Sequence, residues 1–250
     1  MHILNLGGMQ CDDGFLLQGS NAGSAIERNP TNKFRDLICI AGLIDHPDLG
    51  LTLFETGCAE DVSVAWPAPF SDAFPRTEYT EEMKLPNAIK AAGYDIKDVK
   101  AIVMGHLHLD HAGGLEHFMG TDIPIYVHEE EFKHACWAVG TEADFGVYLP
   151  AMTTSIYATL HFSPGHTPGL CIMQVNLEQD VVFIWTTDQY HVAENHDNNQ
   201  PQGWLARDHN AWVKSHSMIK QLERLFKAKL IFGHDKAVAE KFIAAKKFYE

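Results

Sequence analysis

The feature that most constrains this 250-residue chain is a dense group of polar side chains placed directly after an apolar run. Residues 101–104 read Ala-Ile-Val-Met, and the chain then continues Gly-His-Leu-His-Leu-Asp-His-Ala-Gly-Gly from Gly105. A short continuous apolar run is consistent with a strand that is buried on both faces of a sheet. We therefore expect this strand to carry four side chains into one loop at a sheet end: His106, His108, Asp110 and His111.

These four side chains fall within six residues, so one loop can turn all of them toward the same cavity. Imidazole nitrogens and carboxylate oxygens are suitable zinc ligands, and the cluster holds more donors than one tetrahedral ion accepts from such close positions. Solvated surface histidines would explain neither the spacing nor the glycines that follow. The sequence therefore predicts two metal ions.

Three further donors lie beside other apolar runs. His166 stands in the turn Ser-Pro-Gly-His-Thr-Pro-Gly of residues 163–169, Asp188 follows residues 181–185, and His234 follows Leu-Ile-Phe-Gly at 230–233. Functional residues gather on loops that a rigid sheet positions. Taken singly, each of these residues is more simply a structural one, but beside the first cluster they become predicted ligands.

The rest of the chain reads as strands interrupted by single helices. Helical spacing predicts helices over residues 80–93 and 208–226, and the prolines of residues 66–79 argue against a regular helix or central strand there. This order favours an αββα sandwich, two sheets with helices outside, although a doubly wound sheet has the same pattern. The predicted strands cover residues 38–43 and 51–54, which form a hairpin, and residues 101–104, 123–127, 157–162, 170–175, 181–185 and 229–232.

Composition narrows the class of protein. The hydrophobic and charged shares, 46% and 21%, are those of a globular chain, and we expect one domain over residues 1–250. A net charge of -14 argues against a nucleic-acid partner and favours a small-molecule substrate. The first residues show neither the basic start nor the apolar stretch of a secretory signal, so we expect none, and we expect no membrane span because no apolar run is long enough. The five scattered cysteines suggest a reduced, cytoplasmic protein.

The motif His106-x-His108-x-Asp110-His111, followed in order by His166, Asp188 and His234, resembles that of the metallo-β-lactamase superfamily. Within it the chain looks most like the N-acyl homoserine lactonases, the quorum-quenching enzymes, from the Glu55-Thr56-Gly57 turn to the final Phe-Gly-His-Asp. The resemblance implies the αββα sandwich fold. It also implies a hydrolase that opens a lactone or related carboxylic ester.

The resemblance further implies roles for each donor. One zinc would be held by His106, His108 and His166, the other by Asp110, His111 and His234, with Asp188 bridging. Attack by a hydroxide between the two ions would then open the substrate ester. Asp110 would manage the proton of the leaving alkoxide.

Two positions depart from the pattern of the lactonases. Glu55 stands where the relatives have an aspartate, one methylene shorter, so the surroundings of the metals are expected to differ. Tyr190 follows Asp188 one residue sooner than the tyrosine thought to bind substrate, so its predicted catalytic role is open. We assign no site role to Cys58, or to His191, His196 and His209 in the polar loop after Asp188.

Alternatives to a lactonase remain at this stage. The same metals could act on a thioester, β-lactam, phosphodiester or sulfate ester, or the fold could serve as a non-catalytic binding module. Substrate specificity is expected from loops 60–79, 135–157 and 189–206. The aromatic residues of 66–74 could line a substrate site, but we favour packing within the domain. The oligomeric state is open, a homodimer included.

Overall fold

The computed structural model describes residues 1–141, 143–144, 147–148, 160–177 and 182–244. Within these residues two sheets lie face to face, with strand orders β4-β1-β2-β3-β5-β6 and β10-β9-β8-β7. The first sheet consists of β1 (His2–Asp12), β2 (Phe34–His46), β3 (Gly50–Phe54), β4 (Arg76–Glu78), β5 (Ala101–Val103) and β6 (Ile125–Tyr126). The second consists of β7 (Leu160–Phe162), β8 (Cys171–Asn176), β9 (Val182–Trp185) and β10 (Lys229–Ile231).

Three of the strands that lead to the predicted donors, β5, β9 and β10, have at least one parallel neighbour. β3 pairs with β5, and β5 with β6, in parallel register, while β9 pairs with β10 in the same way. β2 and β3 form the predicted antiparallel hairpin. The carboxyl ends of parallel strands lie at the same edge of a sheet, so the loops after β9 and β10 lie side by side. The loop after β5 belongs to the other sheet and can join them because the two sheets face each other.

The two sheets meet through an apolar core. Ile38, Ile40, Phe54 and Val103 of the first sheet pack in one cluster with residues of the second sheet that include Trp185. The rings of Phe54 and Trp185 meet edge to face, with centroids 5.6 Å apart. Gly42 makes room for this indole, because a Cβ at that position would lie 2.9 Å from its Cζ3 atom. This core joins the sheets into a sandwich.

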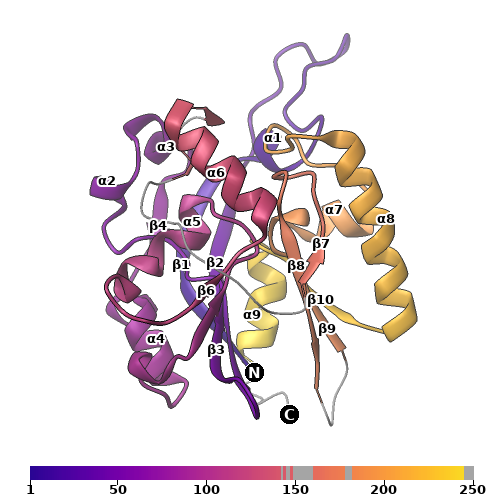
Figure 1. Cartoon of the computed structure of the whole chain (residues 1–250). Helices are drawn as coiled ribbons and strands as arrows, with labels where there is room; N and C mark the ends of the chain where they lie inside the picture. Colours follow the sequence, from indigo (N-terminus) through magenta and orange to yellow (C-terminus); the bar gives the residue numbers. More distant parts are fainter. Residues whose placement is uncertain (142, 145–146, 149–159, 178–181, 245–250) are drawn as a thin grey trace.

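Helices cover the outer faces of the sandwich (Figure 1). Buried Leu85, Ala88 and Ile89 of α4 pack on the outer side of the first sheet, and Trp212 and Ile219 of α8 pack on the second. The αββα prediction is therefore confirmed, and the chain is not a doubly wound sheet. The helices are α1 (Asp13–Leu16), α2 (Val62–Ala65), α3 (Ala68–Ala73), α4 (Leu85–Ala91), α5 (Leu109–Ala112), α6 (Glu129–Thr141), α7 (Ala193–Asp197), α8 (His209–Phe226) and α9 (Lys236–Ala244).

The predicted elements need several corrections. The helix expected over residues 80–93 is a 3₁₀ turn at Glu81–Met83 followed by α4, which begins with Pro86 in its first turn. The expectation of no helix in residues 66–79 was wrong, because Pro69 lies in the first turn of α3, where no helical hydrogen bond is lost. β1, α6 and α9 were not predicted. Residues 157–159 and 181 of two predicted strands lie outside the described residues.

No helix among the described residues combines the length and the apolar character needed to cross a bilayer.

Candidate metal centre

Loops at the strand ends carry all seven predicted donors into one region. After β5 the chain passes through His106 and enters α5, whose N-cap is His108 and whose first turn holds Asp110. Asp188 lies in a 3₁₀ turn, Thr187–Gln189, directly after β9, and His234 follows β10. The structure therefore brings together the residues that the sequence predicted to be neighbours.

His166 reaches the same region from the turn between β7 and β8. Gly165, with φ +144°, shapes this turn, and a Cβ there would lie 2.5 Å from the Cα atom of Trp212 in α8. Only glycine combines this backbone conformation with so close an approach to a helix. The packing of the turn on α8 thus fixes where His166 points.

The donor atoms fall into two groups that share one carboxylate. Within each group, all donor atoms lie within 4.8 Å of one another. The first group consists of His106, His108, His166 and Asp188; the second consists of Asp110, His111, Asp188 and His234. This is the division into two sets, with Asp188 common to both, that the resemblance to the metallo-β-lactamase superfamily implied.

Distances within the groups fit metal coordination. The His166 Nε2 and His108 Nδ1 atoms are 3.1 Å apart, and the Nε2 atoms of His111 and His234 are 3.2 Å apart. Ligands about 2.0–2.1 Å from a tetrahedral zinc lie about 3.3 Å from one another. His106 Nε2 and Asp188 Oδ1 are buried and make no hydrogen bond to the described residues. The residues present therefore fit two divalent metal ions.

The outward nitrogens of the histidines are held by groups of different kinds. His111 Nδ1 lies 3.1 Å from the Glu55 carboxylate, His166 Nδ1 lies 3.1 Å from the Gln202 amide oxygen, and His234 Nδ1 lies 3.1 Å from the Ile38 carbonyl. Such partners fix the tautomer and the ring orientation of a metal-binding histidine. Each imidazole can then present a lone pair to the centre.

In the metal-free protein, the pKa values of the histidines differ between the two donor groups. Burial is the main reason that the pKa values of His106, His108 and His166 lie well below the ordinary 6.5. Burial also opposes protonation of His111 and His234, but the carboxylates of Asp188 and Asp110 outweigh it and raise the pKa of both. The imidazoles of His106, His108 and His166, which we call the three-histidine group, are therefore neutral near pH 7. His111 and His234 together retain a proton at that pH.

A narrow cavity of about 20 Å³ adjoins both donor groups, room for little more than one water molecule. Its wall contains His108, Asp110, His166, Asp188, His191 and His234, together with apolar side chains. It shares Phe70, Phe74, Val147 and Leu205 with a wider cleft of about 930 Å³. The donors thus lie at the narrow end of a larger apolar cleft.

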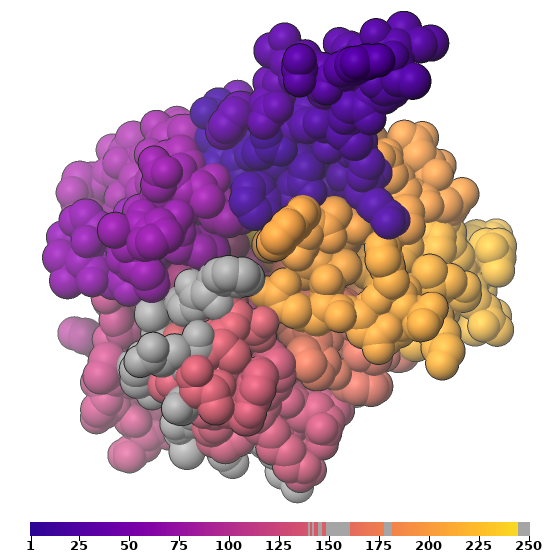
Figure 2. Space-filling view, turned by 90° about the horizontal axis from the view of Figure 1, so that it is seen from above, coloured from indigo at the N-terminus to yellow at the C-terminus, as the bar shows by residue number. Residues whose placement is uncertain are grey.

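The wider cleft is built from segments far apart in the sequence. Most of its wall comes from three segments: residues 12–22 near the N-terminus, residues 69–74 in and just after α3, and residues 203–209, which lead into α8. Figure 2 looks onto the face where the indigo, purple and orange segments around these residues meet. Residues from all three predicted specificity loops line it, but the part played by residues 12–22 was not predicted. Phe74 is 6% exposed and packs in the core while also facing the cleft.

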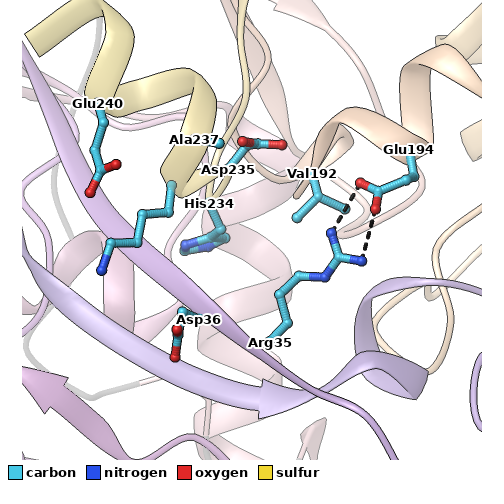
Figure 3. Close-up of a pocket in the computed structure, with 9 residues that line it drawn as sticks. Arg35, Asp36, Val192, Glu194, His234, Asp235, Ala237 and Glu240 are labelled. Carbon is cyan, nitrogen blue, oxygen red and sulfur yellow. Dashed lines mark hydrogen bonds and ion pairs between the residues drawn. The ribbon is translucent and has the colours of Figure 1, made fainter.

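A second, polar pocket lies beside His234 (Figure 3). In its wall the Arg35 guanidinium pairs with Glu194 at 2.8 Å and with Asp13 at 2.6 Å. These ion pairs tie β2 to α7 and to α1. Through Glu194 of α7, they hold the segment that follows Asp188 in place, without contacting the donor groups themselves.

The structure does not bring Tyr190 to the centre. Its side chain packs among Trp212, Phe232 and other members of the cluster beneath α8, and its hydroxyl lies 2.8 Å from His216 Nδ1. The residue stands one position too early for its side chain to face the cavity. We therefore assign Tyr190 no catalytic role.

Sequence reasoning missed several residues around the donors. The buried Glu131 carboxylate of α6 accepts hydrogen bonds from the Leu107 amide at 3.0 Å and from the Thr167 hydroxyl at 2.5 Å. It therefore links the loop of His106 and His108 to the turn of His166. Neither Glu131 nor Gln202 has a recognisable spacing from the donors, so the sequence held no signal for them.

The fold and the donor groups define an αββα protein with a candidate dinuclear metal centre. Residues 35–234 match the model of the metallo-beta-lactamase superfamily, which is most of the chain, and this protein belongs to that superfamily.

Its relatives include lactonases. The chain is 24% identical to the N-acyl homoserine lactonase AiiB of Agrobacterium fabrum, over 94% of this chain and 93% of that protein. It is 30% identical to an N-acyl homoserine lactonase from a Bacillus species, over 62% and 64% of the two chains. A solved N-acyl homoserine lactone hydrolase, with N-hexanoyl-L-homoserine at its metal centre, has a TM-score of 0.78 at 24% identity, covering 96% of this chain and 94% of that one. This structural likeness supports the fold.

Proposed function

We propose that this protein is a dinuclear metal-dependent hydrolase that opens N-acyl homoserine lactones, a quorum-quenching activity, or cleaves related carboxylic esters. The observation that carries the proposal is the pair of four-residue donor groups that share Asp188 at the end of an apolar cleft. The near full-length similarity to AiiB supports the substrate class.

In this proposal His106, His108 and His166 would hold one ion, Asp110, His111 and His234 would hold the other, and Asp188 would contact both. Nitrogen and oxygen donors of this kind suit zinc, and we propose zinc as the metal. When bound, two divalent ions supply Lewis acidity and a water that ionises near neutral pH. No serine or cysteine nucleophile is then needed.

The protein's own residues bind and orient the substrate. Phe70, Phe74 and Leu205 lie where the cleft narrows toward the donors, so an acyl chain can pack there while the ester lies at the mouth of the narrow cavity. Asp110 is the one member of the two donor groups that is not fully buried: its side chain is 13% exposed and lines that cavity. In this proposal its carboxylate would hold a proton and release it to the leaving alkoxide.

The test combines metal analysis with a substrate assay on the same preparation. Wild-type protein is expected to bind about two zinc ions per chain and to hydrolyse N-hexanoyl homoserine lactone. His108→Ala should lose both metal and activity, whereas His128→Ala, outside both donor groups, should retain them. Retention of metal and activity by His108→Ala would refute the assigned centre.

A panel of substrates separates the alternatives. A thioester, a β-lactam, a phosphodiester and a sulfate ester should each react at least a hundredfold more slowly than the lactone. A faster reaction with any of them would replace the lactone as the substrate class. Wild-type protein that binds no metal and cleaves nothing would instead indicate a binding module.

A further inference from the structure

The side chain of His191 lies beside the donor groups yet belongs to neither of them. It is 1% exposed, and its Nε2 atom is 3.3 Å from Asp188 Oδ2. Neither ring nitrogen makes a hydrogen bond of acceptable geometry to any described residue. An unsatisfied buried polar group costs about 1–3 kcal/mol, so this imidazole needs a partner that the described part of the chain does not supply.

The ring of His191 is directed at the space where a substrate would react. It lines the narrow cavity together with Asp110, Asp188 and His166. The ring stacks on His234 at an interplanar angle of 17° with centroids 5.9 Å apart, and meets the His166 ring at 77° and 5.0 Å. His191 thus stands between a histidine of the first donor group and one of the second.

The backbone around His191 is held rigidly. Its amide donates to the Asn195 side chain at 3.0 Å, and its carbonyl accepts the His234 amide at 2.8 Å. The Ala193 amide donates to Asp235 at 2.8 Å, while the ion pair of Arg35 with α7, drawn in Figure 3, secures the same segment. The imidazole is therefore placed before any substrate arrives.

We propose that His191 is a catalytic residue that donates a ring N–H to the carbonyl oxygen of the substrate and to the negative charge that develops on it. This inference rests on the proposed esterase function. Either neutral tautomer of an imidazole carries one N–H, so the role does not depend on a change of protonation. A fixed donor aimed at developing charge in a water-poor site typically contributes about 10²–10³ in kcat.

Three variants test the role: His191→Leu removes both ring nitrogens, His191→Gln keeps an amide N–H, and His128→Leu is the control outside the cavity. We expect about two ions per chain in all of them. With N-hexanoyl homoserine lactone, kcat should fall about 10²–10³-fold in His191→Leu and recover to within about tenfold of wild type in His191→Gln. His128→Leu should match wild type.

A binding measurement gives a readout besides activity. Calorimetry with the ring-opened product, N-hexanoyl-L-homoserine, should show at least tenfold weaker binding to His191→Leu than to wild type, because one hydrogen bond is lost. The thermal unfolding temperatures of the zinc-loaded proteins serve as the folding check. His191→Phe, which keeps a planar ring without an N–H group, carries the test if His191→Leu does not fold.

Distinct results would overturn the inference and the function beneath it. If kcat and the product affinity of His191→Leu equal those of wild type, His191 has no role in catalysis, and the proposed function is unaffected. Loss of one ion in both His191 variants would make His191 a ligand instead. Wild-type protein inert toward every ester would refute the proposed function itself.

Discussion

Replacing Glu55 by glutamine should weaken the second metal group selectively. The Glu55 carboxylate is 1% exposed and reaches the centre from the end of β3. Its Oε2 atom lies 3.1 Å from His111 Nδ1, and its Oε1 atom accepts the Gly105 amide at 2.9 Å and the Thr187 hydroxyl at 3.3 Å. A carboxylate in this position keeps the proton on Nδ1 and leaves the Nε2 lone pair free for a metal.

Glutamine has nearly the same shape but must turn one end toward each set of partners. If its oxygen keeps the Gly105 amide, its NH₂ group faces His111 and favours the tautomer with the proton on Nε2. Loss of such a partner typically weakens metal binding 10–100-fold, which is about 1.4–2.7 kcal/mol. The effect should fall on the ion of Asp110, His111 and His234 more than on the other ion.

Chelator competition measures the affinity of each ion, and nuclear magnetic resonance follows the titration of His111 in the metal-free protein. Glu55→Gln should lose 10–100-fold in the second affinity and show a lower His111 pKa, because one of the carboxylates that raise it is gone. Glu55→Asp keeps the charge, and Glu129→Gln changes an exposed carboxylate of α6 as a control. If Glu55→Gln binds both metal ions with the affinities of wild type, this reasoning is refuted.

Three further outcomes follow from the same structure. Glu131→Ala leaves the buried Leu107 amide and the hydroxyls of Tyr148 and Thr167 without their acceptor. Chemical denaturation should therefore show a free energy of unfolding lower by about 3–5 kcal/mol, whereas Tyr148→Phe should lower it by less than about 1.5 kcal/mol. Trp185→Ala, at the interface of the two sheets, should lower the free energy of unfolding by about 3–5 kcal/mol in the same assay. The raised pKa values of His111 and His234 mean that the second ion must displace a proton, so its affinity should increase up to about tenfold per pH unit above pH 6.5 until the pair is neutral. Over that range calorimetric titrations should find a nearly constant metal affinity for the three-histidine group, because the pKa values of its histidines are lowered. The same dependence of affinity on pH for both ions would contradict the assignment.

The donors were predictable because their signal is local. His106 to His111 are almost adjacent in sequence, and His166, Asp188 and His234 each accompany a strand of recognisable apolar pattern. Strand ends in a sandwich of mixed sheets converge on one edge, so knowing the strands was enough to expect one site. The same alternation of elements favoured the αββα order without excluding a doubly wound sheet, and the resemblance to the metallo-β-lactamase superfamily implied the sandwich.

The residues that orient the donors could not be predicted in this way. Gln202 holds His166 from 36 positions away, and Glu131 joins two loops from a helix that the periodicity did not reveal. Such partners depend on the final packing of distant segments rather than on spacing in the chain. Tyr190 shows the converse case, since its place in the sequence suggested a site residue while its side chain faces the core beneath α8.

Backbone strain at the centre occurs where the two sheets meet. Glu55, at the end of β3, has φ +63°, and Thr187, just after β9, has φ +40°, a conformation that a β-branched residue rarely adopts. Strain of this kind persists only where the surrounding structure fixes it. Here the two residues contact one another, since the Thr187 hydroxyl lies 3.3 Å from Glu55 Oε1 and 3.4 Å from His106 Nδ1. One strained residue from the end of a strand in each sheet thus contacts a histidine of a different donor group, so the arrangement of both donor groups depends on how the two sheets pack together.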